Sequence, residues 1–511
     1  MLESGMDLTQ ESVGTSATSA TLKAREEARR LSAKILIDGR LCAAASAQTF
    51  AVENPADLSL IAEVARSNAI DVQQAVDAAQ RAFAGWSSTP SRERGRLLAK
   101  VADRLEANGQ ELARLLCLET GNAYSTQAIP EVATMVDVFR FFAGLGGELK
   151  GRTVPWPGNV LCYTTRDPLG VVAAIIPWNA PLFLTACKLG PALVAGNTVV
   201  LKTAEQAPLA VLRAFELMQE VLPAGVANVL SGFGEEVGKP LAEHPLVRKV
   251  TFTGSSAVGQ AILRYAADKI CPVTLELGGK SPNVVMPGAD LSRVIPGIVL
   301  GMRFTRQGQS CSAGTRLFLH EEIYDEVLER LVGELAKLRV GDPMDPATDI
   351  GAIVSREQLD RVLHYVELAR ATPGSRIVCG GKQPTDTRLS GYFYAPTLID
   401  GLPHSSPACQ DEIFGPVAIA FRWRDFNAML EQANDTRYGL AAAIWTRDLA
   451  AAMTFARRIQ AGFVQVNQYI APQANVPYGG FKLSGLGKEN TLEAMLEHFT
   501  CSKTVMINTG A

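Results

Sequence analysis

Two residues of this sequence, a cysteine and a glutamate, have side chains and neighbours that suit covalent catalysis. Cys311 lies in the polar run Gly-Gln-Ser-Cys-Ser-Ala-Gly, residues 308–314, where exposure and a lowered pKa would make its thiol nucleophilic. Glu276 lies between two leucines in an alternating stretch, where burial would raise the pKa of its carboxyl and suit a base that activates water. A core thiol and a structural glutamate paired with a lysine remain the alternatives.

Other polar residues at the ends of apolar stretches could bind an oxyanion or a nucleotide. Asn179 follows a Pro-Trp pair and could donate to an oxyanion, although a turn asparagine that bonds its own backbone is more frequent. Lys202 and Glu205 could bind ribose hydroxyls, and the carboxylate would repel a 2′-phosphate; a solvated charge pair is the alternative. Residues 253–259, Thr-Gly-Ser-Ser-Ala-Val-Gly, could place a helix start against a pyrophosphate, but they do not form a GxGxxG fingerprint.

A regular alternation of strands and helices between residues 170 and 280 must position these groups. Near-continuous apolar strands indicate a parallel, doubly wound sheet that is covered on both faces. Ligands bind such sheets at the carboxyl ends of the strands, where the polar residues fall. The expected strands are residues 171–176, 198–202, 227–230, 249–253 and 273–277, and the expected helices are 182–195, 209–221, 235–243 and 258–269.

The flanking segments predict more helices and a second α/β region. The alternation around Asp38-Gly39 predicts a hairpin over 35–52, and residues 1–33 read as a flexible extension that runs into a short helix at about 22–32. Further helices are expected at 71–86, 92–108, 111–119, 131–144, 291–302, 323–338 and 492–500, and further strands at 160–165, 316–319, 441–445 and 502–507.

Composition excludes several classes of function. The 511 residues suffice for two or more domains, and the net charge of −3 gives no electrostatic case for nucleic-acid or membrane binding. Nine cysteines without a CxxC pair and five scattered histidines predict neither a disulfide framework nor a metal site. No apolar run reaches membrane-spanning length, and the first residues lack the apolar core of a secretory signal, so we expect a cytoplasmic protein.

Five motifs in order identify a family that the chain resembles. From about residue 34 to the C-terminus the sequence is similar to the NAD(P)-dependent aldehyde dehydrogenase superfamily. The motifs are Pro-Trp-Asn at 177–179, Leu-Glu-Leu-Gly-Gly-Lys at 275–280, Gly-Gln-Ser-Cys at 308–311, Glu-Ile-Phe-Gly-Pro at 412–416 and Pro-Tyr-Gly-Gly-Phe-Lys at 477–482.

The resemblance implies a two-stage reaction. Cys311 would attack the aldehyde carbon, while the Asn179 side chain and the Cys311 backbone N–H hold the oxyanion. Hydride transfer to the nicotinamide would leave a thioester, and Glu276 would activate the water that hydrolyses it. Lys188 and Glu489 resemble a proton-relay pair that supports Glu276.

The resemblance also implies a cofactor site for NAD, with NADP less favoured. Lys202, Glu205 and Glu412 correspond to ribose contacts, Phe414 lies beside the nicotinamide, and Ser255 contacts the pyrophosphate. The complete expected set is Ile176, Pro177, Trp178, Lys202, Glu205, Gly254, Ser255, Val258, Leu277, Glu412 and Phe414.

The implied architecture is an α/β fold with a doubly wound Rossmann-like cofactor domain, a second α/β catalytic domain and a small β oligomerisation arm that forms a homodimer or homotetramer. The expected bounds are an extension at 1–33, a NAD-binding domain at 34–145 and 168–280, a catalytic domain at 281–488, and an arm at 146–167 and 489–511.

The expected substrate pocket departs from the family pattern. Ala180, Cys187, Thr305 and Pro472 replace common aromatics, which favours a bulky or aromatic aldehyde over a small aliphatic one. Arg303 and Arg306 could instead indicate an acidic semialdehyde, unless they face solvent. A CoA-acylating enzyme is disfavoured by Glu276, and a non-enzymatic binding role by the intact catalytic residues. The expected lining is Ala180, Leu184, Cys187, Thr305, Ser310, Ser312, Pro472 and Tyr478.

Overall fold

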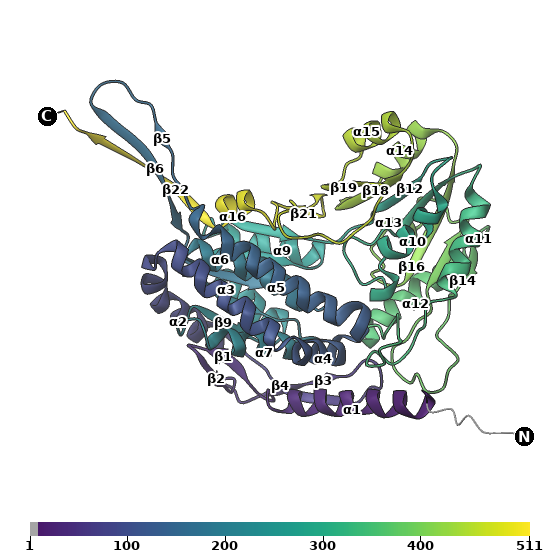
Figure 1. Ribbon diagram of the computed structural model, residues 1–511, viewed down its shortest axis with the longest axis horizontal. Helices are drawn as coiled ribbons and strands as arrows, with labels where there is room; N and C mark the ends of the chain where they lie inside the picture. The colour runs from purple at the N-terminus through teal and green to yellow at the C-terminus, as the bar shows by residue number, and fades with distance from the viewer. Residues whose placement is uncertain (1–8, 511) are drawn as a thin grey trace, which may run out of the picture.

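Two mixed sheets, each covered by helices on both faces, form two lobes joined side by side (Figure 1). This computed structural model describes the backbone of residues 9–510 and the side chains from residue 19. A narrow β arm projects from the first lobe. The expected α/β fold class is confirmed.

The first sheet has eight strands in the order β2-β1-β9-β8-β7-β10-β11-β21. Its five central strands run parallel, whereas the strands at both edges are antiparallel. Every residue of β7 is buried, as expected for a strand covered on both faces. The bounds are β2 (Arg40–Cys42), β1 (Ile35–Ile37), β9 (Ala227–Leu230), β8 (Thr198–Lys202), β7 (Val171–Ile175), β10 (Val247–Thr253), β11 (Val273–Glu276) and β21 (Gly485–Leu486).

Alternate residues of the central strands belong to two separate hydrophobic cores, one on each face of the sheet. Val172 and Ala174 of β7 pack with α3 to α7, while Val171 and Ala173 pack with α2, α8 and α9. The helices are α2 (Ala69–Ser88), α3 (Ser91–Ala107), α4 (Gly109–Thr120), α5 (Ile129–Gly144), α6 (Pro181–Ala195), α7 (Leu209–Gln219), α8 (Lys239–Glu243) and α9 (Ser256–Ala267).

The second sheet has seven strands in the order β14-β15-β16-β13-β12-β18-β19, and only β14 runs antiparallel to its neighbour. Its strands are β14 (Arg376–Cys379), β15 (Thr397–Asp400), β16 (Val417–Trp423), β13 (Arg316–His320), β12 (Pro282–Val285), β18 (Ala441–Trp445) and β19 (Phe463–Val466). One core contains α10 (Leu291–Gly301) and α11 (Tyr324–Leu335); the other contains α12 (Arg356–Ala371), α13 (Pro407–Gln410), α14 (Phe426–Asn434) and α15 (Leu449–Arg458).

The projecting arm consists of β5 (Thr153–Val154), β6 (Val160–Pro168) and β22 (Thr500–Asn508). Strand β22 pairs antiparallel with β6 along its whole length and is an edge of this sheet. The preceding helix α16 (Leu492–His498) packs against α6 in the first lobe.

Two expectations for the N-terminal region are wrong. The expected hairpin over 35–52 ends at residue 42, where β2 ends, and β1 also pairs with β9. Residues 49–53 belong to another sheet, since they form β3 (Thr49–Glu53), which pairs with β4 (Leu60–Ala65). The helix expected at about 22–32 is present but begins earlier, because residues 9–29 form α1 (Thr9–Arg29); α1 packs on α4 and β4, so the expected flexible extension is wrong for residues 9–21. The part of that expectation that concerns residues 1–8 lies outside the described residues.

Buried groups of α1 explain why it packs. Ala24, Ala28 and Leu31 form an apolar stripe with helical spacing, which is fully covered. The buried Glu27 carboxylate accepts two hydrogen bonds from the Arg114 guanidinium of α4. Because α1 contains many small, polar and charged residues, its sequence resembles that of a solvent-exposed segment.

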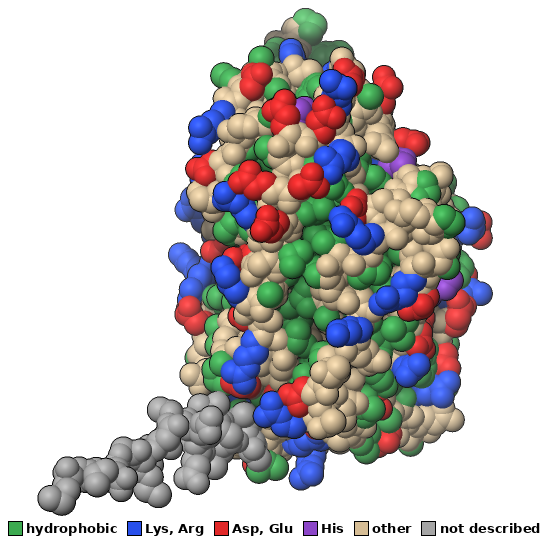
Figure 2. All heavy atoms as spheres, turned by 90° about the vertical axis from the view of Figure 1, so that its right-hand side faces the viewer, with side chains coloured by type: hydrophobic (Ala, Val, Ile, Leu, Met, Phe, Trp, Pro, Cys, Tyr) green, Lys and Arg blue, Asp and Glu red, His purple; other side chains and the backbone are tan. Residues whose placement is uncertain are grey.

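The surface carries both signs of charge. On the face of the second lobe shown in Figure 2, basic and acidic side chains are interspersed, in keeping with the small net charge. Within residues 9–510, no helix is long and apolar enough to cross a membrane.

Candidate active site

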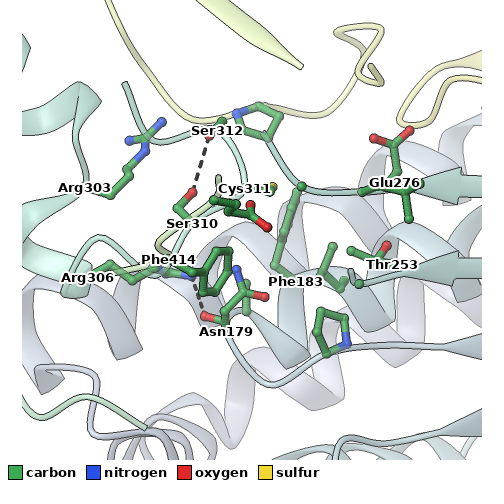
Figure 3. A pocket seen from close by; sticks show the side chains of 18 of the residues that line it. Asn179, Phe183, Thr253, Glu276, Arg303, Arg306, Ser310, Cys311, Ser312 and Phe414 are labelled. Carbon is green, nitrogen blue, oxygen red and sulfur yellow. Dashed lines mark hydrogen bonds between the residues drawn. The ribbon is translucent and has the colours of Figure 1, made fainter. Parts of the chain in front are cut away.

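A cavity of about 900 Å³ lies where residues of the first sheet's carboxyl edge face residues of the second lobe. Asn179 follows β7, Thr253 ends β10 and Glu276 ends β11, whereas Cys311 precedes β13. All four side chains line the cavity (Figure 3). The edge of the first sheet and the loop before β13 thus bring together Asn179, Glu276 and Cys311, the three residues that the sequence singled out for chemistry.

The loop that carries Cys311 is held from several sides. Gly308 adopts φ +65°, and a Cβ there would lie 2.0 Å from the Gly415 carbonyl oxygen, so only glycine fits. Tyr469 Oη donates to the Ser312 carbonyl at 2.7 Å, and Gln309 Oε1 accepts from a backbone N–H at 3.1 Å. The position of the thiol is therefore determined by packing rather than by a flexible loop.

The expected lowering of the Cys311 pKa is wrong. The pKa of the thiol is raised to about 11, chiefly by burial and also by nearby Glu412 and Glu276, whereas a hydrogen bond with Tyr478 lowers it. The Cys311 Sγ and Tyr478 Oη atoms lie 3.5 Å apart. Cys311 is consequently a protonated thiol at neutral pH and must lose its proton during the reaction.

Asn179 is directed at the nucleophile loop. Its Nδ2 donates to the Gln309 carbonyl at 3.1 Å, and its own backbone carbonyl accepts from Arg306 Nη1 at 3.0 Å. A side-chain amide has two N–H donors, so one remains for a ligand oxygen. The two hydrogen bonds fix the orientation that an oxyanion donor needs.

Glu276 is buried on another side of the cavity. Burial raises the pKa of its carboxyl well above the ordinary value, and the negative Glu489 adds to this effect. A Cβ at Gly479 would lie 2.7 Å from Glu276 Oε1, so the glycine makes room for the carboxylate. In Figure 3 the carboxylate points away from Cys311, which suits a base that acts through water.

A buried charge pair lies behind Glu276. Lys188 Nζ donates to the Glu489 carboxylate, which also accepts from Thr251 Oγ1 at 3.3 Å. Glu489 lines the cavity, whereas Lys188 does not. Both charges act on the Glu276 carboxyl, which places the expected relay pair beside the base.

Most of the expected cofactor residues border the cavity. The Trp178 and Phe414 rings meet edge to face with centroids 5.4 Å apart. Glu412 Oε1 accepts from the Gly279 N–H at 3.0 Å, and burial raises the pKa of this carboxyl to about 7. The lining includes Pro177, Trp178, Gly254, Ser255, Leu277, Glu412 and Phe414.

Four expected cofactor residues lie outside the cavity lining: Ile176, Lys202, Glu205 and Val258. Lys202 is buried at the end of β8, with its Nζ 3.6 Å from Glu205 Oε2. Ser255 is the N-cap of α9 (Ser256–Ala267), and its Oγ accepts from the Val258 N–H at 3.4 Å. The four residues continue the same carboxyl edge of the first sheet.

Seven of the eight expected substrate residues line the cavity; Thr305 is the exception. It lies in the short 3₁₀ turn η4 (Phe304–Arg306), and its hydroxyl accepts from Gln127 Nε2 at 2.8 Å. Arg303 and Arg306 both line the cavity, so they do not simply face solvent. The expected substrate residues that line the cavity are Ala180, Leu184, Cys187, Ser310, Ser312, Pro472 and Tyr478.

Some functional positions carried no signal in the sequence. Gln127 and Glu131 line the cavity, but polar residues on a helix resemble a solvated face. Tyr469 and Gln309 hold the nucleophile loop through contacts with distant segments. Among the described side chains, no group of three or more His, Cys, Asp or Glu residues could hold a metal ion.

Comparisons with known proteins agree with this geometry. The family model described as aldehyde dehydrogenase family matches residues 42–505. The aldehyde dehydrogenase of Enchytraeus buchholzi is 40% identical over 484 residues, which cover 93% of this chain and 96% of the relative.

Solved structures extend the similarity to the whole fold. PnpE of Pseudomonas sp. WBC-3, whose structure contains nicotinamide adenine dinucleotide, is 41% identical with a TM-score of 0.91, covering 94% of this chain and 98% of its own. The NAD⁺ complex of an aldehyde dehydrogenase from Bacillus cereus is 37% identical with a TM-score of 0.92, covering 95% and 98%.

Proposed function

The chain belongs to the aldehyde dehydrogenase family, and on that premise we propose that it oxidises an aldehyde to a carboxylic acid with NAD. The observation that carries the proposal is that Cys311, Asn179 and Glu276 line one cavity from three separate segments. A nucleophile, an oxyanion donor and a base in one cavity suit acyl transfer through a covalent intermediate.

NAD fits the carboxyl edge of the first sheet. Lys202 and Glu205 lie together at the end of β8 and would bind ribose hydroxyls, while the Glu205 carboxylate would repel a 2′-phosphate. The aromatic pair of Trp178 and Phe414 would bound the nicotinamide end. When bound, the cofactor accepts a hydride from the substrate carbon. Two similar structures that contain this cofactor support the choice.

In the first stage, Cys311 Sγ forms a bond with the aldehyde carbon. The thiol proton passes to solvent water in the cavity, and the carbonyl oxygen becomes an oxyanion. Asn179 Nδ2, already oriented by the Gln309 carbonyl, would donate to this oxygen together with the Cys311 backbone N–H. Oxidation of the carbon then restores the C=O bond and leaves a thioester on Cys311.

In the second stage, Glu276 accepts a proton from water as the water oxygen attacks the thioester carbon. The C–S bond breaks, and Cys311 leaves as a thiolate with the acid as product. Lys188 and Glu489 would stabilise and pass on the proton held by Glu276. The sum is aldehyde, NAD⁺ and water giving carboxylate, NADH and two protons. An acyl-transfer enzyme that uses CoA would not need Glu276.

The cavity also suits a bulky or aromatic aldehyde. Ala180, Cys187 and Pro472 present small side chains to a cavity of about 900 Å³, part of which the cofactor would fill. We therefore include a preference for large over small aliphatic aldehydes in the proposal.

The proposal assigns residues 34–145 and 168–280 to the NAD-binding domain and 281–488 to the catalytic domain. The exposed edge of β22 supports a homodimer or homotetramer assembled through the arm. The cytoplasm is the proposed compartment, because the reaction needs Cys311 as a free thiol.

Substitution of the nucleophile tests the proposal. Wild-type enzyme should convert aromatic aldehydes to acids with NAD at equal rates with and without CoA. Cys311→Ala should lower kcat/KM by about four orders of magnitude, because the covalent route is lost. Cys501→Ala, at an exposed cysteine of the arm, is the matched control and should turn over normally. Turnover by Cys311→Ala, or an acyl-CoA product, would refute the assignment.

A further inference from the structure

Arg303 is a cation of the cavity that the chain leaves without a partner. It follows α10 at a left-handed φ of 58° and lines the cavity. Its Nη2 atom is buried and has no hydrogen-bond partner. Among residues 19–510, no carboxylate lies within ion-pairing distance of its guanidinium.

The neighbouring Arg306, in contrast, has an ion-pair partner and hydrogen-bond acceptors within the protein. Its guanidinium lies 3.2 Å from Glu131 Oε2, 2.8 Å from Gln127 Oε1 and 3.0 Å from the Asn179 carbonyl oxygen. Arg306 therefore has a structural role, because it links Glu131 of α5 to the backbone of Asn179. Glu131 pairs with Arg306 alone, which leaves the charge of Arg303 without a paired carboxylate at this end of the cavity.

An unpaired buried guanidinium is costly. Buried polar groups in proteins are almost always hydrogen-bonded, and buried charges are normally paired. None of the carboxylates that line the cavity pairs with Arg303: Glu131 pairs with Arg306, Glu489 pairs with Lys188, and Glu412 accepts from the Gly279 N–H. The described chain therefore leaves this position open for the acidic group of a ligand.

The surroundings of Arg303 favour a ligand that also reaches the nucleophile. The guanidinium interacts electrostatically with the Cys311 thiol and with the hydroxyls of Tyr469 and Tyr478. Figure 3 shows it on the same side of Cys311 as Ser310 and Ser312, whose hydroxyl oxygens lie 3.4 Å apart. A carboxylate in this corner would meet the planar fork of an arginine and two further donors.

We propose that Arg303 binds a carboxylate of the substrate, so that the enzyme acts on aldehydes that carry an acid group at the far end of the molecule. The inference rests on the proposed oxidation and names the substrate class of the same site. Cys311 would hold the aldehyde carbon and Arg303 the acid. The product of the balanced reaction given above would then be a dicarboxylate.

Matched substrate pairs test this inference. We suggest para-carboxybenzaldehyde against para-methylbenzaldehyde, and glutaric semialdehyde against pentanal. The wild-type enzyme should favour the acidic member of each pair in kcat/KM. Arg303→Met should lower the acidic-to-neutral ratio of kcat/KM about 100-fold, through KM for the acidic member, because a charge-assisted bidentate contact is lost.

Two further variants make the result specific. Arg303→Lys keeps the charge without the fork and should give an intermediate ratio. Arg293→Met removes an exposed arginine of α10 that does not line the cavity, and it should leave the ratio at the wild-type value. The lysine variant also keeps the test decisive if Arg303→Met fails to fold.

The outcomes separate the two proposals. If the wild-type enzyme oxidises neither member of any pair, the proposed function fails. If it oxidises both members equally and the Arg303 variants leave the ratio unchanged, the oxidation stands and the carboxylate role of Arg303 is overturned.

Discussion

The pKa of the Cys311 thiol depends on neighbours that come from distant parts of the chain. Tyr478 contributes a hydroxyl 3.5 Å from the sulfur, and Glu276 and Glu412 contribute negative charge that opposes ionisation. With a pKa of about 11, the resting thiol is protected from oxidation and alkylation. Activation must therefore occur when the substrate and cofactor bind.

Removal of the Tyr478 hydroxyl should make the thiol still less acidic. Below pH 11 the thiolate fraction rises with pH, so the alkylation rate of Cys311 should rise about tenfold per pH unit. Tyr478→Phe should lower that rate about fivefold at each pH, since its hydrogen bond favours the thiolate. Iodoacetamide labelling of the Cys311 peptide, followed by mass spectrometry, measures this rate.

Tyr438→Phe is the control for Tyr478→Phe, because Tyr438 also lines the cavity but makes no hydrogen bond to Cys311. Labelling of Tyr478→Phe that equals or exceeds the wild-type rate would contradict the role given to this hydroxyl.

The sequence singled out Cys311, Glu276 and Asn179, which line one cavity, but it did not indicate the electrostatic state of Cys311. The motif around Cys311 and the strand context of Glu276 pointed to a thiol nucleophile and a buried base. The pKa of Cys311 depends on Tyr478, which is 167 residues away in the sequence, so no local pattern could indicate it. Thr305 was misplaced for the same reason, since its partner Gln127 lies on another segment.

Among the secondary-structure elements, apolar strands and amphipathic helices were predictable within a few residues. The predicted helix over 209–221 is α7 (Leu209–Gln219), and the predicted strand over 198–202 is β8. Helix α1 was misread, because its stripe of small residues is narrow and its stability comes from packing on α4. Local composition does not show such tertiary contacts.

The buried pair of Glu27 and Arg114 should be the main polar anchor of α1. The two side chains are only 4% and 10% exposed, so Glu27→Leu would leave a buried guanidinium unpaired. We expect a loss of about 3 kcal/mol in the stability of this packing and a lower Tm. Differential scanning calorimetry measures the shift.

The double variant Glu27→Leu/Arg114→Leu should recover part of the lost Tm, because it leaves no unpaired charge. Arg30→Leu serves as the control, since this arginine is 65% exposed and its ion pair with Glu111 spans 3.8 Å. An unchanged Tm in Glu27→Leu would show that the ion pair does not anchor the helix.

For the whole molecule, assembly of the site depends on contacts between distant segments. Strand β21 pairs with β11, which brings the chain around Gly479 against the Glu276 carboxylate. Lys188 reaches Glu489 across 301 residues of sequence. The sequence indicated the sheet edge at which these residues gather, but the position of the second lobe against that edge arises from the packing of both cores.

The proposed function, with groups from both lobes, requires a covalent acyl-enzyme that Glu276 resolves. Glu276→Gln keeps the shape of the side chain and removes the base. Mixed with benzaldehyde and NAD, this variant should release about one equivalent of NADH per active site and then nearly stop. Benzaldehyde is neutral, so the result is independent of Arg303.

Mass spectrometry of the acid-quenched Glu276→Gln variant is the most direct measurement of this claim. The account predicts a benzoyl mass on the peptide that contains Cys311, with no adduct in the Cys311→Ala/Glu276→Gln double variant. Steady turnover without an adduct would contradict Glu276 as the hydrolytic base. Absence of both burst and adduct in a folded protein would instead place Glu276 before thioester formation.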